Sequence, residues 1–161
     1  MTSPEPPAVA CVDWVRFGTP EEAAADAGAV LRGTVVARDD DTVLMYGVES
    51  QRWLVDVVQV LERPDPPPGR GEPQPELDVT AGERIAVVST PETCSGDAHP
   101  GGDPLDPASG LADEDGTVLV LLSAASGEEP GDDVGFHLIT PYQGVLTPAD
   151  DGTLPAEWPS P

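Results

Sequence analysis

The alternation of apolar and polar positions is clearest over residues 52–62, which read Arg-Trp-Leu-Val-Asp-Val-Val-Gln-Val-Leu-Glu. Trp53, Val55 and Val57 recur at every second position, which is the period of a strand with one buried face. The phase slips at Val58, where one extra residue, a β-bulge, would return the later valines to the same core face. A helix also fits the spacing of some apolar positions, but the density of valines and the Arg-Pro that follows favour a strand.

Shorter apolar runs predict the remaining strands. We expect strands over residues 30–38, 84–89, 117–122, 134–140 and 145–147, and a strand over 42–47 that continues into 52–62 through a kink at residues 47–51. The Asp39–Asp41 run is predicted to form a turn between strands 30–38 and 42–47. Gly33, inside the first strand, indicates a bulge or a close approach of another backbone. In the strand over residues 134–140, Phe136 and Leu138 are expected to face inward and His137 outward.

One short helix is predicted immediately before the strands. Thr19 is suited to the N-cap, Pro20 to the first helical position, and Glu22 to the return bond of a capping box. An alanine-rich turn follows and ends at Gly28. With five or six strands and no βαβ alternation, this predicts a mainly β fold: a small antiparallel OB-like barrel with one N-terminal helix and long Pro/Gly-rich loops.

The length of 161 residues is that of one domain, and 17 glycines and 20 prolines concentrate in apparent loops. We expect a disordered leader over residues 1–10, a single barrel domain over 11–155 and a flexible tail over 156–161. Residues 64–82 and 90–116 are predicted to be long loops. No apolar run reaches the length that a membrane span requires.

The charge balance is strongly acidic, with 30 Asp and Glu against seven arginines and a formal net charge of −23. Such a surface repels phosphate backbones and anionic lipids, which argues against nucleic-acid and membrane-surface binding. We expect a protein partner, with a cationic surface as the natural complement. Mimicry of DNA would require regularly spaced acids on an ordered scaffold, whereas many of these acids fall in loops.

No familiar catalytic motif occurs, including Gly-x-Ser-x-Gly, the P-loop and His-Glu-x-x-His. Cys94 and His99 share a Gly/Pro-rich loop, which is a poor place to hold a nucleophile and a base at hydrogen-bond distance. We therefore predict no enzymatic activity, no catalytic residue, no metal and no cofactor. The acids of residues 97–115 could coordinate Ca²⁺, but their spacing matches no EF-hand, and we interpret them as surface acids.

The two cysteines, Cys11 and Cys94, are equivocal by themselves. They are either separate reduced thiols or, in an exported protein, a disulfide that closes a long loop and stabilises the fold by roughly 4–5 kcal/mol. The Ala-Val-Ala of residues 8–10 is similar to the end of an export cleavage site. No positively charged segment and no apolar segment precede it, so residues 1–10 do not form a signal peptide.

The order of these features resembles the netrin-like module, an OB-type barrel that includes the N-terminal domain of tissue inhibitors of metalloproteinases. A first Cys precedes a Pro-Glu-Glu-Ala-Ala-Ala helix, strands 29–35 and 53–61 follow, and strand 85–90 runs into Thr-Pro-Glu-Thr-Cys. The chain is also similar to uncharacterised exported bacterial proteins with a Gly-Thr-Val early strand and a Thr-Pro-Tyr-Gln-Gly-Val ending. The resemblance implies a Cys11–Cys94 disulfide.

The resemblance also implies a function: an exported, non-enzymatic binding or cell-envelope module. In the inhibitors, the free amine of the first Cys ligates the protease zinc, so a chain cleaved before Cys11 would use Cys11 and Val12 as an inhibitory wedge. Two departures stand against this alternative: the chain lacks the family's further disulfides, and Val12 replaces its Ser or Thr. A third hypothesis is an acidic cytoplasmic interaction protein or nucleic-acid mimic.

Overall fold

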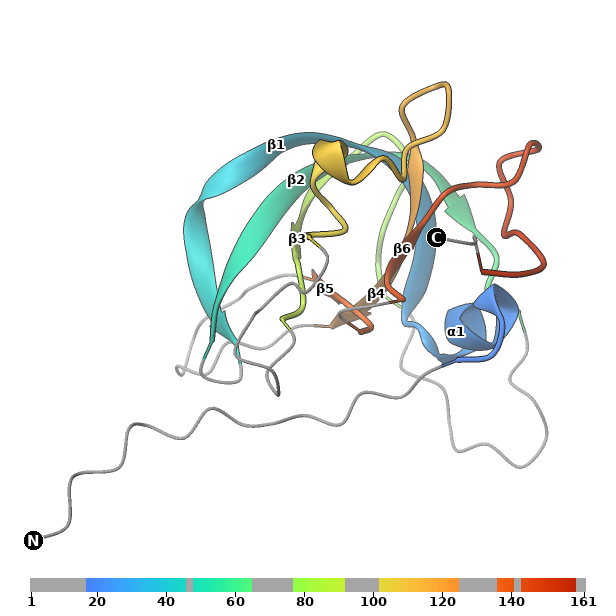
Figure 1. Ribbon diagram of the computed structural model, residues 1–161, viewed down its shortest axis with the longest axis horizontal. Helices are drawn as coiled ribbons and strands as arrows, with labels where there is room; N and C mark the ends of the chain where they lie inside the picture. Colours follow the sequence, from blue (N-terminus) through green and yellow to red (C-terminus); the bar gives the residue numbers. More distant parts are fainter. Residues whose placement is uncertain are drawn as a thin grey trace, which may run out of the picture.

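The computed structural model describes residues 17–45, 48–64, 77–91, 102–124, 136–140 and 143–158 (Figure 1). Its elements in chain order are the helix α1 (Pro20–Asp26), the strands β1 (Ala29–Met45), β2 (Val48–Leu61) and β3 (Arg84–Val88), the 3₁₀ turn η1 (Pro107–Ser109), and the strands β4 (Val118–Ala124), β5 (Phe136–Leu138) and β6 (Val145–Leu146). The prediction of a mainly β, OB-like barrel with one short N-terminal helix is confirmed.

The barrel wall closes in the order β1-β2-β3-β5-β4-β1, and β6 adds to the edge of β4 that also holds β5. Every pair is antiparallel except β3–β5, which is parallel. The expectation of a wholly antiparallel barrel was therefore wrong at this pair. The reason is one of parity: five strands in a closed ring cannot alternate direction all the way round, so one neighbouring pair must be parallel.

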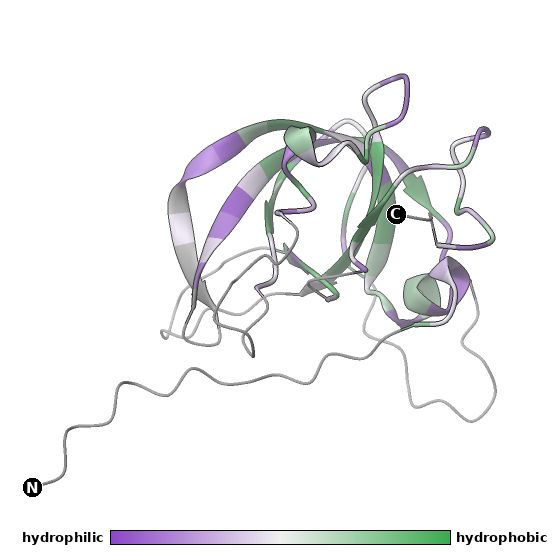
Figure 2. Cartoon of the chain, viewed as in Figure 1, coloured by the Kyte–Doolittle hydropathy of each residue, from purple (hydrophilic) through white to green (hydrophobic). Residues whose placement is uncertain are grey.

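The β1–β2 hairpin is longer than expected, because β1 continues through the predicted turn at Asp39–Asp41. Arg38 pairs with Trp53 and Thr42 with Gln51, so three aspartates lie opposite a single residue of β2 and form an irregularity in the strand. Asp39 accepts a hydrogen bond of 2.9 Å from Arg52 Nε across the two strands. This ion pair favours continuation of the hairpin over a turn. Figure 2 shows that this half of the hairpin is largely hydrophilic.

The predicted bulge in β2 is present, since Gly33 pairs with Val57 and Arg32 with Gln59, which leaves Val58 unmatched. The bulge returns Val60 to the side of its partner Leu31, a core residue, as predicted, but the later valines are not buried. Val57 is 3% exposed, whereas Val58 is 45% and Val60 is 40% exposed. β3 pairs with β2 only up to Asp56, so the last residues of β2 extend beyond the neighbouring strand that would cover them.

Gly33 lies where another backbone comes close, as the sequence predicted. A β-carbon at this position would lie 2.7 Å from the Asp56 carbonyl oxygen and 2.8 Å from Val55 Cγ1. Both distances are shorter than any real van der Waals contact, so only glycine allows β1 and β2 to approach each other here.

Two apolar clusters hold the fold together. The first fills the barrel and includes Trp53, Val55, Val120 and Leu138. The second lies outside the wall, where α1 and the C-terminal segment cover β1, β4 and β6; it includes Val30, Leu119, Leu121, Leu146, Ala23 and Ala24. β4 contributes to both clusters because its residues alternate between the two sides, which explains its uninterrupted apolar sequence.

Helix α1 begins as the sequence predicted. The Thr19 side chain accepts a hydrogen bond from Glu22 N at 3.2 Å, and Pro20 is the first helical residue. The Glu22 carboxylate accepts from Gly18 N at 3.1 Å, so the return bond is made to the residue before the N-cap and not to the N-cap itself as in the predicted capping box. Small alanines then let the helix backbone pack close to the barrel wall.

Phe136 and Leu138 pack in the inner cluster as predicted, but His137, on the other side of β5, is buried and not exposed. Its Nδ1 lies 3.1 Å from Thr90 Oγ1 and 2.7 Å from the Leu138 carbonyl oxygen. A carbonyl can only accept, so this contact places the ring hydrogen on Nδ1. Thr90, which follows β3 and is fully buried, lies against the ring, and the strand's alternation alone does not predict this cover.

Candidate binding groove

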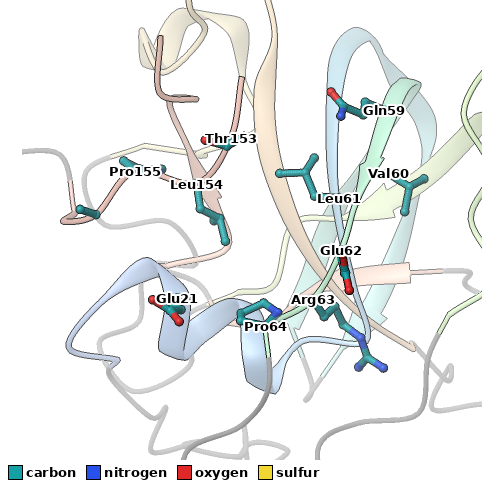
Figure 3. A pocket seen from close by; sticks show the side chains of 11 residues that line it. Glu21, Gln59, Val60, Leu61, Glu62, Arg63, Pro64, Thr153, Leu154 and Pro155 are labelled. Carbon is teal, nitrogen blue, oxygen red and sulfur yellow. The ribbon is translucent and has the colours of Figure 1, made fainter. Parts of the chain in front are cut away.

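An open groove of about 750 Å³ lies on the outer side of the barrel, between the end of β2, helix α1 and the C-terminal segment (Figure 3). It is lined by Glu21, Gln59, Val60, Leu61, Glu62, Arg63, Pro64, Thr153, Leu154, Pro155 and Ala156. These residues come from three parts of the chain that are far apart in sequence. The lining combines aliphatic and proline surface with two carboxylates.

The first wall is the last part of β2 and the three residues after it. Gln59 pairs with Arg32 and Leu61 with Val30, so their side chains share the outer side of the barrel with Val30, a residue of the second apolar cluster. Figure 3 shows Leu61 directed toward the C-terminal segment, with Val60 on the opposite side of the strand. The bulge at Val58 thus decides which side chains of β2 reach the groove.

The second wall is a tight turn followed by an extended segment. Ala149 N donates to the Thr153 carbonyl at 2.9 Å, and Gly152 N donates to the Ala149 carbonyl at 2.8 Å. Asp151 Oδ1 accepts from Thr153 N and Thr153 Oγ1, and these two bonds lower the pKa of Asp151. Gly152 has a φ of 82°, the left-handed region that favours glycine. The turn is therefore held by local bonds before Leu154 enters the groove.

The C-terminal segment, residues 147–158, is anchored to the fold by apolar packing and by a side-chain hydrogen bond. Leu154 and Trp158 pack against the second apolar cluster, and Trp158 Nε1 donates to the Phe17 carbonyl at 2.9 Å. The Gln143 amide makes bonds of 2.7 Å to Phe17 N and 2.9 Å to the Phe17 carbonyl. Part of the segment predicted to be a flexible tail thus contacts the fold.

Of the three charged residues that line the groove, Arg63 is held by a hydrogen bond to the backbone, whereas Glu21 and Glu62 are exposed. Arg63 Nη1 donates to the carbonyl of Ala27, the C-cap of α1, at 2.7 Å and so satisfies the end of the helix. Glu21 and Glu62 are exposed and contribute two negative charges. The groove is therefore apolar along its walls and acidic at the end near α1 (Figure 3).

The residues singled out by sequence are not among those that the structure describes. Cys11, Val12 and Cys94 all fall outside the described residues, as does His99. The Cys11–Cys94 disulfide and the inhibitory wedge therefore stay predictions. The structure brings together instead a set of aliphatic, proline and glutamate residues for which the sequence carried no motif.

Three acids of the 102–117 segment accept hydrogen bonds that hold this part of the chain. Asp103 accepts from Trp53 and Ser89, Asp106 caps η1 by accepting from Ala108 N, and Asp113 accepts from Thr117. Within the described ranges, no three His, Cys, Asp or Glu side chains gather in an arrangement that could hold a metal ion. Asp97 lies outside those ranges.

The outer face of β2 and β3 is the surface with which OB folds bind oligonucleotides. Here its arginines are matched by aspartates. Arg84 Nε donates to Asp56 Oδ1 at 2.6 Å, and this bond lowers the pKa of Asp56; Arg52 is paired with Asp39. The pairs reduce the positive charge that this face could offer to a phosphate backbone.

Comparison with protein-family models, with curated proteins and with solved structures found no match for this chain. The netrin-like resemblance accordingly remains a prediction. In the part of the chain that the structure describes, no helix has both the length and the apolar character needed to cross a membrane.

Proposed function

We propose that this protein is a non-enzymatic, exported binding module whose groove holds an extended segment of a protein partner. The observation that carries the proposal is the groove itself, with its aliphatic and proline walls and its two exposed carboxylates. The proposal that the protein is exported is based on the sequence alone.

Charge complementarity defines the partner. Glu21 and Glu62 lie at one end of the groove, Arg63 is engaged with the Ala27 carbonyl, and the whole chain has a formal net charge of −23. A segment with Lys or Arg between aliphatic or proline side chains would satisfy both the carboxylates and the apolar walls. An acidic segment would be repelled.

The composition of the groove supports a binding role over catalysis. Among the residues that the structure describes, the lining contains no His, Ser or Cys, and the Thr153 hydroxyl donates to Asp151 Oδ1. His137, the described histidine, is buried against Thr90 and the Leu138 carbonyl. Nucleophilic catalysis needs a nucleophile and a base within hydrogen-bond reach of each other, and the groove residues do not supply such a pair.

The proposal is tested with two fluorescent octapeptides. In both, apolar residues (Pro, Leu and Val) alternate with a charged residue, which is Lys in one peptide and Glu in the other. Fluorescence anisotropy with the full chain should show binding of the Lys peptide, weakening with salt, and no binding of the Glu peptide. Replacement of both Glu21 and Glu62 by Lys should weaken binding of the Lys peptide by roughly tenfold or more.

The matched control reverses two exposed acids away from the groove, Glu83→Lys with Glu114→Lys, which changes the net charge equally. If the control weakens binding as much as the groove variant does, binding follows overall charge and the groove proposal fails. Absence of binding of the Lys peptide to the unmodified chain would also reject it.

A further inference from the structure

A further arginine, Arg32, lies next to the groove but is not among the residues that line it. Arg32, on β1, extends its guanidinium between Gln59 and Gly152: Nη2 is 3.5 Å from Gln59 Oε1, and a β-carbon on Gly152 would lie 3.4 Å from Nε. Gln59 and Thr153 line the groove at the end opposite Glu21 and Glu62 (Figure 3). The guanidinium is therefore next to that end of the groove, beside Gln59, and a ligand in the groove would reach it only where the Gln59 side chain moves.

The donors of Arg32 are not all satisfied. Its Nε is buried and has no hydrogen-bond partner. Within the described ranges it forms no ion pair, although Arg52 is paired with Asp39 and Arg84 with Asp56. A buried donor without an acceptor costs free energy, and such a group calls for a specific explanation.

The geometry of the guanidinium indicates which acceptor is missing. Nε and Nη2 lie on one edge of the plane, and this edge donates two parallel hydrogen bonds to the two oxygens of a carboxylate. Gln59 presents one amide oxygen to Nη2 at 3.5 Å, which is long for a hydrogen bond, and does not reach Nε. Because Gln59 is exposed, its side chain can move aside.

The neighbouring carboxylate of Asp113 does not fill this role. Asp113 Oδ1 accepts from Asp115 N and Thr117 N, and Oδ2 accepts from Thr117 Oγ1. The Thr117 backbone bond is the largest cause of the lowered pKa of Asp113, and the charge of Arg32 is the smallest. Asp113 thus balances the charge of Arg32 from a distance without bonding to it.

We propose that Arg32 binds the C-terminal carboxylate of the peptide segment that the groove holds. This inference rests on the proposed function and assigns the direction of the bound segment. The stretch from Gln59 to Pro64 spans roughly 16 Å, room for about four or five extended residues. Because the Gly152 turn packs over the guanidinium, a chain end fits there better than a chain that continues.

The bound segment then runs from the acidic end to the basic end of the groove. A Lys or Arg side chain lies near Glu21 and Glu62, aliphatic residues contact Leu61 and Leu154, and the terminal carboxylate reaches Arg32. The net charge of −23 disfavours anions over most of the surface. Recognition of a carboxylate therefore depends on this one guanidinium.

The test compares two forms of one peptide, acetyl-Lys-Leu-Pro-Leu-Val, with a free C-terminal carboxylate or a C-terminal amide. Titration calorimetry with the full chain should give roughly tenfold tighter binding of the acid form. Arg32→Gln should abolish this preference. Arg32→Lys retains the charge but not the paired donors, and should keep only part of it.

The matched control is Arg38→Gln, which removes the same charge from an exposed position on the same strand and should keep the preference. A second readout is the Nε–H resonance of Arg32 in arginine-labelled protein, which should shift on addition of the acid peptide and not of the amide. Unlike a loss of stability, this shift reports a direct contact.

Three outcomes would overturn the inference. Equal affinity of the two forms, with sensitivity to Glu21 and Glu62 retained, would remove the carboxylate site and leave the groove proposal intact. A preference that survives in Arg32→Gln would place the carboxylate elsewhere. Absence of binding of both forms would reject the carboxylate site, and absence of binding of the Lys octapeptide as well would reject the groove.

Discussion

Trp53 and Asp103 are joined by a hydrogen bond of 3.0 Å from Trp53 Nε1 to Asp103 Oδ2. The other oxygen of Asp103 accepts from Ser89 Oγ at 2.7 Å and from Leu105 N at 3.0 Å. One carboxylate thus ties β2 and the end of β3 to the loop that follows, and places Leu105, which is 1% exposed, in the barrel core. A polar contact at the wall of the barrel thereby positions an apolar side chain in its core.

We predict that Asp103→Asn destabilises the fold by about 1–3 kcal/mol, because an amide presents a donor where Trp53 or Ser89 also donates. Urea unfolding followed by circular dichroism measures the effect. Asp106→Asn is the control: Asp106 uses one oxygen, to accept from Ala108 N, and an amide oxygen can replace it, so the change should stay within about 0.5 kcal/mol. Equal effects of the two substitutions would contradict the role given to Asp103.

The bulge in β2 predicts unequal costs at adjacent valines. Val57→Ala removes buried methyl groups from the barrel core and should cost about 2–3 kcal/mol. Val58→Ala should change stability by less than about 0.5 kcal/mol, since Val58 is exposed. The midpoints of urea unfolding compare the two directly, and a larger effect at Val58 would mean that the register of β1 and β2 is different.

Asp113 should contribute to acid sensitivity. Hydrogen bonds from the backbone and side chain of Thr117 hold the pKa of Asp113 below its ordinary value of 3.8. A carboxyl with a lowered pKa in the folded state stabilises the fold above its ordinary value, and this contribution is lost as the pH falls through the folded-state pKa. The stability difference between the unmodified chain and Asp113→Asn should therefore be largest near pH 7 and shrink below pH 3.8.

Urea unfolding at a series of pH values measures this difference. Glu114→Gln is the control, because no hydrogen bond to the Glu114 carboxylate is described and its stability difference should not shrink in the same way. A stability difference for Asp113→Asn that stays constant down to the lowest pH would exclude the contribution.

The implied disulfide has a direct test on the natively produced protein. Intact mass before and after reduction and alkylation should show that Cys11 and Cys94 are protected until they are reduced. Cys11→Ser, Cys94→Ser and the double variant should each lose the same stability, at most roughly 4–5 kcal/mol, since all three remove one crosslink. Two thiols that react without reduction, or additive effects of the two single variants, would show that the cysteines are unpaired.

The sequence by itself determined the features that depend on near neighbours or on one residue's shape. Thr19 and Pro20 start α1 because a cap needs only the next three residues. The valine alternation before Val58 predicted a strand and its bulge, and Gly33 marked the close approach of two backbones. These features have local causes, namely hydrogen bonds within one turn and the steric size of single side chains.

Only the tertiary structure decided the rest, because the relevant contacts join distant parts of the chain. Asp39 extends the hairpin by pairing with Arg52, and His137 is buried where it contacts Thr90, 47 residues away in the chain. The groove exists because Leu61 and Leu154, far apart in sequence, both pack against the second apolar cluster, and no periodicity within either segment records this. The same holds for Arg32, whose unpaired Nε results from the joint placement of β1, β2 and the Gly152 turn.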